Sequence, residues 1–66
     1  MPNAKEIGER LKKLRGEESQ AAVAEACGIS ISALSMYECG QRIPRDEIKI
    51  KLASHFKESV ESIFFN

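Results

Sequence analysis

The 66-residue sequence has no tryptophan, one tyrosine, three phenylalanines, two cysteines and a single histidine. No apolar run approaches the ~20 residues that a membrane-spanning helix requires, so we expect no membrane partner. Ten basic residues are balanced by ten acidic ones, which gives a formal net charge of zero. The strongly basic composition of many nucleic-acid-binding domains is therefore absent, and a nucleic-acid partner has to be inferred from where the charges lie.

Metal-ligating and redox-active residues are equally scarce. Cys27, Cys39 and His55 are too few, and too far apart in the sequence, to form a metal site, and we expect neither a metal nor a cofactor. Both cysteines fall in predicted helices of a chain without a signal peptide, which indicates free thiols in a reducing cytoplasm. For Cys39 a passive thiol is favoured over a redox switch.

Catalytic patterns are missing as well. No nucleophile or carboxylate has the spacing that would bring it to His55, and the glycines occur singly, so they cannot form a phosphate-binding loop. We predict that the protein is not an enzyme. A helical bundle without a ligand remains the simplest alternative to a binding function.

The length predicts a single domain over residues 1–66. A chain of about 60 residues buries only ~60% of its unfolded surface, so support from a partner subunit is compatible with this size. A first helix is expected from about residue 4 to residue 15, capped by Asn3 with Glu6 in a capping box, and stopped by Gly16. Its apolar stripe repeats at spacings of three and four and consists of Ala4, Ile7, Leu11 and Leu14.

Residues 19–40 predict two short helices that meet at a glycine corner. Ser19 and Ser30 are suitable N-caps, and Gly28 can take the left-handed conformation that ends the first helix. The inward positions of the two helices are Val23, Ala24, Cys27, Leu34 and Tyr37, with Ile29 at the corner. Alanine at position 24 allows the two backbones to approach closely, as in a helix-turn-helix over residues 20–39.

The hydrophobic pattern of the C-terminal third of the chain fits more than one secondary structure. Ile48, Ile50 and Leu52 alternate with lysines as in a strand, but residues 46–56 also fit a helix, which we favour because an isolated strand has no partner. Ile50 fits this helix least well. A short last helix is expected over Val60, Ile63 and Phe64, with Phe65 left over. The predicted fold class is all-α.

These features resemble the helix-turn-helix of the phage-repressor-like Xre family. The matching positions are Gln20, Val23, Ala24, Cys27, Gly28, Ile29, Leu34 and Tyr37. The flanking segments IGERLKKLR, YECGQR and SVESIF are similar to the same family's first helix, loop and last helix. Departures are the short link between Arg15 and Ser19, the Lys57-Glu58 pair in place of a glycine and an apolar residue, and Lys49 at an apolar position.

The resemblance implies a compact five-helix domain whose second helix-turn-helix member lies in the major groove of double-stranded DNA. It places Ile31, Ser32, Ser35 and Met36 at base edges. None of these is a strong base reader such as Arg, Gln or Asn, so DNA shape and half-site spacing would contribute to specificity. The phosphate contacts that it implies are Gln20, Ser30, Gln41, Arg42 and Arg45. An ordinary solvated loop is the alternative for Arg42 and Arg45.

Two further roles follow from the resemblance and from the apolar C-terminus. Arg15 and Glu38 match a family ion pair that braces the first and third helices. Ile63, Phe64 and Phe65 suggest a homodimer contact, although the first two could instead complete the monomer core. The predicted function is a homodimeric repressor that binds a two-fold symmetric operator. The alternative is a protein-interaction module, such as an antitoxin or antagonist, that uses the same fold to bind a partner protein.

Overall fold

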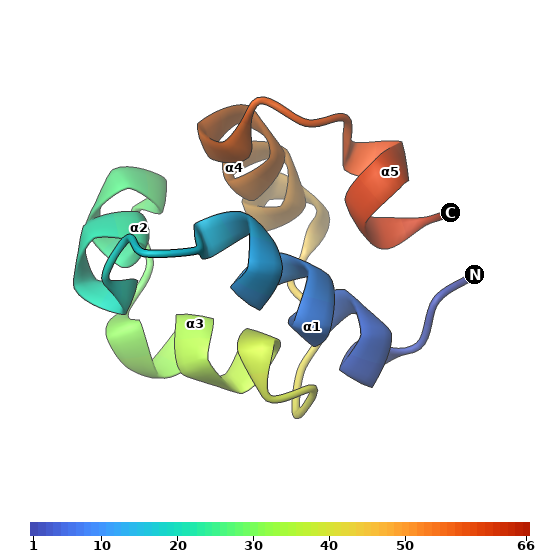
Figure 1. The fold of residues 1–66 in the computed structure, drawn as a ribbon, viewed down its shortest axis with the longest axis horizontal. Helices are drawn as coiled ribbons and strands as arrows, with labels where there is room; N and C mark the ends of the chain where they lie inside the picture. Colours follow the sequence, from blue (N-terminus) through green and yellow to red (C-terminus); the bar gives the residue numbers. More distant parts are fainter.

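The computed structural model describes all 66 residues and contains five helices and no strand, which confirms the all-α prediction. The helices are α1 (Ala4–Arg15), α2 (Gln20–Cys27), α3 (Ile31–Glu38), α4 (Asp46–Phe56) and α5 (Val60–Phe64). In Figure 1, α1 crosses the middle of the molecule, with α3 on one side of it and α4 and α5 on the other. The ambiguous segment at residues 46–56 is a helix.

Four of the five helices begin with the side-chain caps that free backbone N–H groups need. Asn3 and Glu6 form the expected capping box at α1, and Ser19 and Ser30 cap α2 and α3. Ser59 caps α5 in the same way, whereas Arg45 before α4 makes no such bond. The starts of the helices are thus encoded by single polar residues next to each helix.

The end of α4 explains one departure from the family pattern. Lys57 has φ 57° and ψ 39°, and its backbone N–H bonds to the carbonyl oxygens of the last turn. This left-handed conformation is the one for which glycine is preferred, and it strains a residue that carries a Cβ by roughly 1–2 kcal/mol. The chain therefore makes a left-handed turn between α4 and α5 at a lysine, without a glycine.

One core holds the five helices together. It contains eleven apolar side chains: Ile7, Leu11, Val23, Ala24, Cys27, Leu34, Ile48, Leu52, Ala53, Ile63 and Phe64. Lys49 adapts to its apolar position by keeping only 13% of its side chain exposed, with Nζ 3.6 Å from Asp46 and 4.6 Å from the centre of the Phe65 ring. Its aliphatic stem is buried while its charge is met by a carboxylate and an aromatic face.

The apolar C-terminal triplet, expected to contact a second copy or to complete the core, is divided between these two environments. Ile63 is 2% exposed and Phe64 1% exposed, because both complete the core of the single chain. Phe65 retains 39% of its surface. Of the three side chains, only Phe65 has surface to offer to another molecule.

Helices α1 and α3 touch through their backbones. A Cβ atom added to Gly8 would lie 2.4 Å from the carbonyl oxygen of Glu38, and one added to Gly40 would lie 2.9 Å from the Cα of Lys5. No side chain fits between the helices at these two points. The position of α3 on the domain is thus set by backbone contact with α1.

Candidate nucleic-acid interface

The helix-turn-helix unit is built from α2, a corner of three residues and α3. Gly28 has φ 69°, and the next backbone N–H, that of Ile29, bonds to the carbonyl oxygen of Ala24 at 2.9 Å. Ile29 packs against the core, and Ser30 starts α3 by accepting a hydrogen bond from the N–H of Ala33 at 3.0 Å. The tight corner fixes α3 across α2, as the sequence predicts.

The four residues expected at base edges all lie on α3, and we call them the recognition face (Ile31, Ser32, Ser35 and Met36). Ile31 is 51% exposed and Ser32 is exposed, whereas Ser35 and Met36 are half-buried. The start of α3 is thus the most exposed part of this helix. These side chains offer hydroxyl and apolar groups but no charge.

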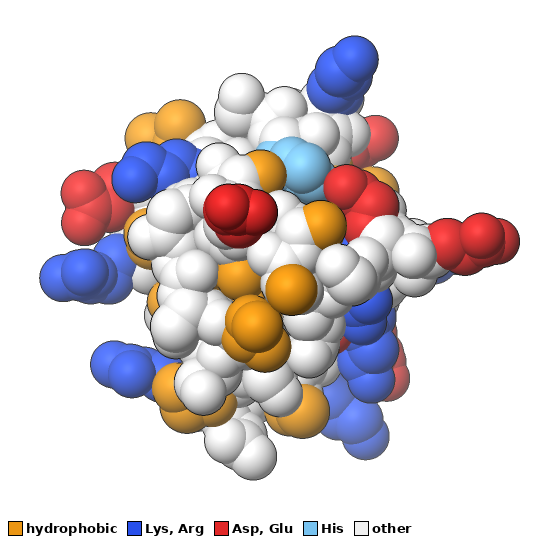
Figure 2. All heavy atoms as spheres, turned by 90° about the vertical axis from the view of Figure 1, so that its left-hand side faces the viewer, with side chains coloured by type: hydrophobic (Ala, Val, Ile, Leu, Met, Phe, Trp, Pro, Cys, Tyr) orange, Lys and Arg blue, Asp and Glu red, His pale blue; other side chains and the backbone are white.

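The charge pattern around this unit is uneven. Apart from the buried Glu38, the only charged residue of α2 and α3 is Glu25, which is exposed. Figure 2 views the side of α2 and the start of α3, and it shows mainly uncharged and apolar groups at the centre, with one acidic side chain above them and both basic and acidic side chains at the margins.

The loop after α3 carries basic side chains close in sequence to the recognition face. Gln41, Arg42 and Arg45 are all exposed, and Arg45 makes only a loose ion pair of 3.7 Å with Glu47. Ile43, between them, is 51% exposed and was not among the predicted site residues. Its position two residues before Arg45 could have suggested an apolar contact, but isolated exposed apolar residues are common.

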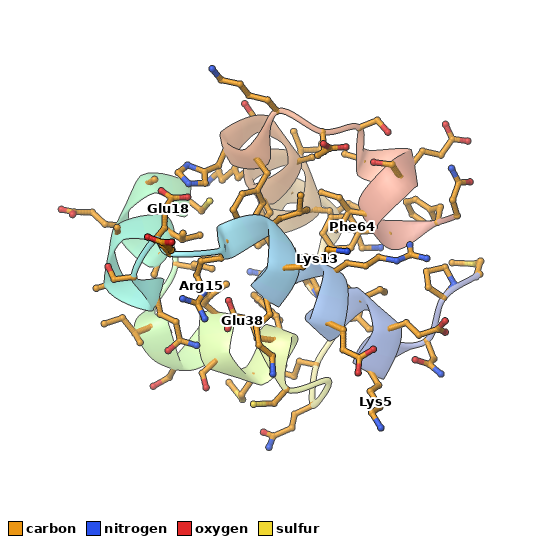
Figure 3. The ribbon with its side chains drawn as sticks, viewed as in Figure 1. Lys5, Lys13, Arg15, Glu18, Glu38 and Phe64 are labelled. Carbon is orange, nitrogen blue, oxygen red and sulfur yellow. The ribbon has the colours of Figure 1, made fainter.

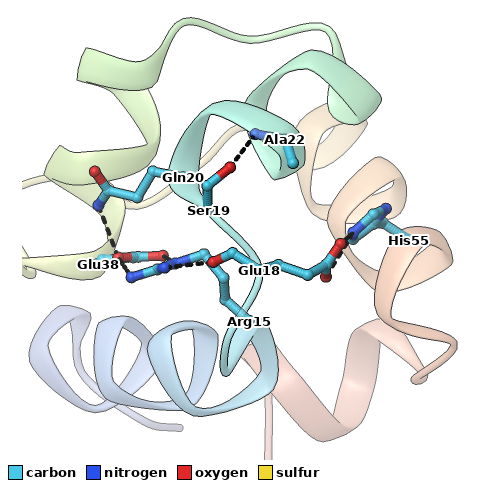
Figure 4. A network of polar contacts seen from close by, with 7 residues as sticks. All are labelled: Arg15, Glu18, Ser19, Gln20, Ala22, Glu38 and His55. Carbon is cyan, nitrogen blue, oxygen red and sulfur yellow. Dashed lines mark hydrogen bonds and ion pairs between the residues drawn. The ribbon is translucent and has the colours of Figure 1, made fainter.

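Three helix ends meet at the carboxylate of Glu38, whose side chain is 3% exposed. Arg15 donates from Nε at 2.7 Å and from a terminal nitrogen at 3.1 Å, and Gln20 Nε2 donates at 2.9 Å. Figure 3 shows Arg15 of α1 and Glu38 of α3 pointing toward each other, and Figure 4 shows the complete network. The expected ion pair is present, and Gln20 joins it through a contact that sequence spacing alone did not indicate.

The network keeps Glu38 ionised. Burial acts to raise the pKa of this carboxyl, but the hydrogen bonds from Arg15 and Gln20, with the charges of Arg15 and Lys12, lower it below its ordinary value. The hydrogen bond to Glu38 raises the pKa of Arg15 in turn, against the effect of burial. Both residues are thus held in their charged forms, as a buried pair requires.

The polar network continues to α4. Arg15 also donates to the backbone oxygen of Glu18 at 2.7 Å, and the carboxylate of Glu18 lies 3.1 and 3.2 Å from His55 Nε2. Figure 4 shows this continuous path from Glu38 to His55. His55, for which no catalytic partner is expected, thus holds the turn between α1 and α2 through Glu18.

The remaining features considered in the sequence are metal-ligating residues, membrane-spanning segments and the two cysteines. No cluster of three or more metal-ligating side chains occurs, and no helix is long and apolar enough to cross a membrane. Cys27 is buried, and burial raises the pKa of its thiol, with the charge of Lys51 acting in the opposite direction and that of Glu18 in the same one. Cys39 is exposed and free.

A helix-turn-helix on a five-helix core, with an exposed second helix, defines a class of DNA-binding domains. A helix-turn-helix family model matches residues 11–63, and the chain belongs to this Xre-like family. The crystal structure of the restriction-modification controller protein C.AhdI from Aeromonas hydrophila is similar, with a TM-score of 0.85 and 28% sequence identity. The match covers 92% of this chain and 96% of that one. A comparison with curated protein sequences gave no match. The protein is a DNA-binding transcriptional regulator.

Proposed function

We propose that the protein is a homodimeric repressor that inserts α3 into the major groove of a two-fold symmetric operator. The observation that carries this proposal is the uncharged recognition face, exposed at Ile31 and Ser32, beside the exposed loop with Arg42 and Arg45. A dimer would hold two half-sites about one helical turn apart. A repressor of this kind acts by occupying a promoter, and we place it with the DNA in the cytoplasm.

The proposed division of work on DNA follows the chemistry of the side chains. Ile31 can contact a thymine methyl group, and the serines can donate to or accept from base edges without strong preference. Gln41, Arg42 and Arg45 would bind phosphates. The Ser30 oxygen already accepts the capping bond from Ala33, so this hydroxyl would contact a phosphate as a donor.

Selection of bound duplexes from a random pool tests this assignment. Arg42→Ala is expected to weaken binding to all sequences alike and to reduce the slope of log K against log salt by about one unit. Ile31→Ala is expected to change the preference at one base position. Lys13→Ala is the matched control, since Lys13 lines the groove between α1 and α5, and it should bind as the wild type does.

The outcomes separate the proposal from its alternative. Repression predicts that the protein lowers transcription from a promoter that overlaps the selected site. If neither Arg42→Ala nor Ile31→Ala changes binding, the assigned interface is wrong. If duplex binding shows no salt dependence and a stoichiometric partner co-purifies, the protein-interaction module is the better description.

The proposed dimer contact uses the exposed apolar groups of α4 and the C-terminus. Ile50 is 60% exposed, and it borders a shallow hollow formed with Asp46, Lys49, Val60 and Phe65. Because a two-fold contact pairs the same patch on both copies, Ile50 of each copy can enter the hollow of the other. This accounts for the outward position of Ile50, which fits neither the core nor a solvated helix face.

Sedimentation tests this dimer directly. Phe65→Ser is expected to shift a dimer to a monomer at micromolar concentration, with a moderate loss of stability because Phe65 lies outside the apolar core but covers the charge of Lys49. Phe65→Leu, which keeps apolar surface, is the matched control. A wild type that sediments as a monomer would remove the dimer from the proposal.

The likeness to C.AhdI favours a more specific role, the control of transcription of restriction-modification genes. The test is the position of the selected operator in the source genome. We expect the site upstream of a restriction endonuclease reading frame. A selected site that lies only near unrelated genes would leave a repressor without this role.

A further inference from the structure

Gln20 is held in one orientation by its neighbour. It is the first residue of α2, it is half-buried, and its Nε2 donates to Glu38 Oε1 at 2.9 Å. An ionised carboxylate accepts hydrogen bonds and donates none, so the amide nitrogen of Gln20, and not its oxygen, has to face Glu38. Figure 4 shows the amide oxygen on the side turned away from the carboxylate.

This orientation leaves a defined pair of groups free. The amide oxygen is an acceptor without a partner in the chain, and Nε2 keeps a second hydrogen that it can donate. An oxygen acceptor cannot bind a phosphate, which has no hydrogen to donate. A phosphate contact alone would therefore leave the fixed oxygen unused. An acceptor beside a donor matches the edge of adenine in the major groove, where N6 donates and N7 accepts.

Glu38 also places this pair near α3. Ser35 and Ile31 precede Glu38 by three and seven residues, so the three positions share one side of the helix. A side chain held on Glu38 therefore lies along the row that contains two members of the recognition face. The chain has no Arg, Asn or Gln within α3 itself, and Gln20 supplies the kind of side chain that α3 lacks.

We propose that Gln20 reads an adenine in each half-site, and that Glu38 is the positioning residue that fixes the direction of its amide. This assignment rests on the DNA interface proposed above and goes beyond the phosphate contact that the sequence implied for Gln20. The ion pair with Arg15 supports this positioning role. It keeps Glu38 in its charged form, which can only accept a hydrogen bond and therefore fixes the direction of the Gln20 amide.

The test is a comparison of base preferences. Wild type, Gln20→Met and Gln41→Met are each used to select from a duplex pool randomised over about two helical turns, ~21 base pairs. Methionine keeps the length of glutamine but removes its hydrogen bonds, and it leaves both bonds from Arg15 to Glu38 in place. Gln41→Met is the matched control at an exposed glutamine, where a loss of affinity for all sequences alike is expected.

The expected result is specific to one base. Wild type should select adenine at one position of each half-site, with discrimination of about 10- to 100-fold, and Gln20→Met should lose that preference while keeping the others. A uniform loss of affinity with Gln20→Met would make Gln20 a phosphate contact, and an unchanged motif would make it a brace within the protein. Either result overturns the adenine contact of Gln20 and leaves the proposed repressor function standing. A wild type that selects no motif overturns both proposals.

The positioning role of Glu38 needs its own measurement. In Glu38→Gln the neighbouring amide can accept or donate, so the direction of Gln20 is no longer set, and the adenine preference should fall toward that of Gln20→Met. A purely structural role would lower the midpoint of thermal unfolding and leave base preference unchanged. In the free wild-type protein, one Nε2 hydrogen of Gln20 should exchange with water more slowly than those of the exposed Gln41, as followed by NMR. Equal exchange would refute the fixed orientation even if the variant fails to fold.

Discussion

Replacing Arg15 by methionine isolates the charge that Glu38 depends on. Methionine keeps most of the aliphatic stem of arginine but removes the two hydrogen bonds of 2.7 and 3.1 Å that Arg15 donates to the carboxylate. Glu38 is then left in an environment where its side chain is 3% exposed, with Gln20 as its remaining donor. The variant thus leaves a buried carboxylate without the positive charge and without two of the three hydrogen bonds that offset the cost of its burial.

The expected loss of stability is large for a domain of this size. Removing one partner of a buried ion pair costs about 3–5 kcal/mol, and the 19% exposure of Arg15 places the value near the lower end, about 3 kcal/mol. A chain of 66 residues has a total stability of roughly 3–10 kcal/mol. The midpoint of thermal unfolding should fall by about 12–24 °C, at ~4–8 °C per kcal/mol.

Urea and thermal unfolding followed by circular dichroism measure this loss. Arg45→Met is the control, since the Arg45–Glu47 pair is 3.7 Å long with side chains 85% and 67% exposed, and such pairs contribute about 0–1 kcal/mol. A loss below about 1 kcal/mol for Arg15→Met would refute the view that Glu38 is held by a buried network.

The dependence on pH provides a second check with a definite sign. The folded-state pKa of Glu38 is lowered, so its contribution to stability is fully present above the unfolded value of about 4.3 and is lost as the pH falls through the folded value. In Arg15→Met the burial of Glu38 is less well opposed, and the pKa of this carboxyl should rise. As the pH falls toward about 4.3 the variant should gain stability by protonating Glu38, and below that value the wild type should lose stability, so the difference between the two narrows. Parallel pH profiles would contradict this.

Two other substitutions test features of the backbone. Lys57→Gly should raise the free energy of unfolding in urea by about 0.5–1 kcal/mol, because glycine adopts the left-handed conformation after α4 without strain. The control Lys51→Gly, inside α4, should lower the free energy of unfolding. A loss of stability in Lys57→Gly would refute the strain. Gly8→Ala should lower the free energy of unfolding by more than about 1 kcal/mol, because the new Cβ would lie 2.4 Å from the backbone oxygen of Glu38. Glu9→Ala, at an exposed position of the same helix, is its control. Equal unfolding midpoints for the two variants would show that α1 and α3 can move apart to admit the methyl group.

Much of the fold could be predicted from sequence because its signals are local. Asn3, Ser19 and Ser30 cap helices through bonds to residues three positions away, and Gly16 and Gly28 end helices within one turn. Helical periodicity identified the buried positions, including Val23 and Leu34. The choice of helix for residues 46–56 was correct for a non-local reason, the absence of a strand that could pair with it.

The parts that sequence reasoning missed depend on contacts between distant residues. No periodicity indicates that Gln20 bonds to Glu38 or that Glu18 bonds to His55, since these pairs are separated by 18 and 37 positions. The apolar triplet at residues 63–65 could not be divided into buried and exposed members without the angle at which α5 packs. The burial of Lys49 likewise depends on Phe65 and Asp46 lying on either side of its charge.

The backbone contacts at Gly8 and Gly40 have a consequence for how such a regulator can diversify. Because α3 is seated on α1 by main-chain atoms, this contact does not depend on which side chains occupy the exposed positions Ile31 and Ser32. On the interface proposed above, changes at these positions would alter the preferred operator with little effect on the stability of the fold. Recognition and folding would then be largely separable at the start of a helix of only eight residues, and new binding specificities would arise there by single substitutions without a compensating change in the core.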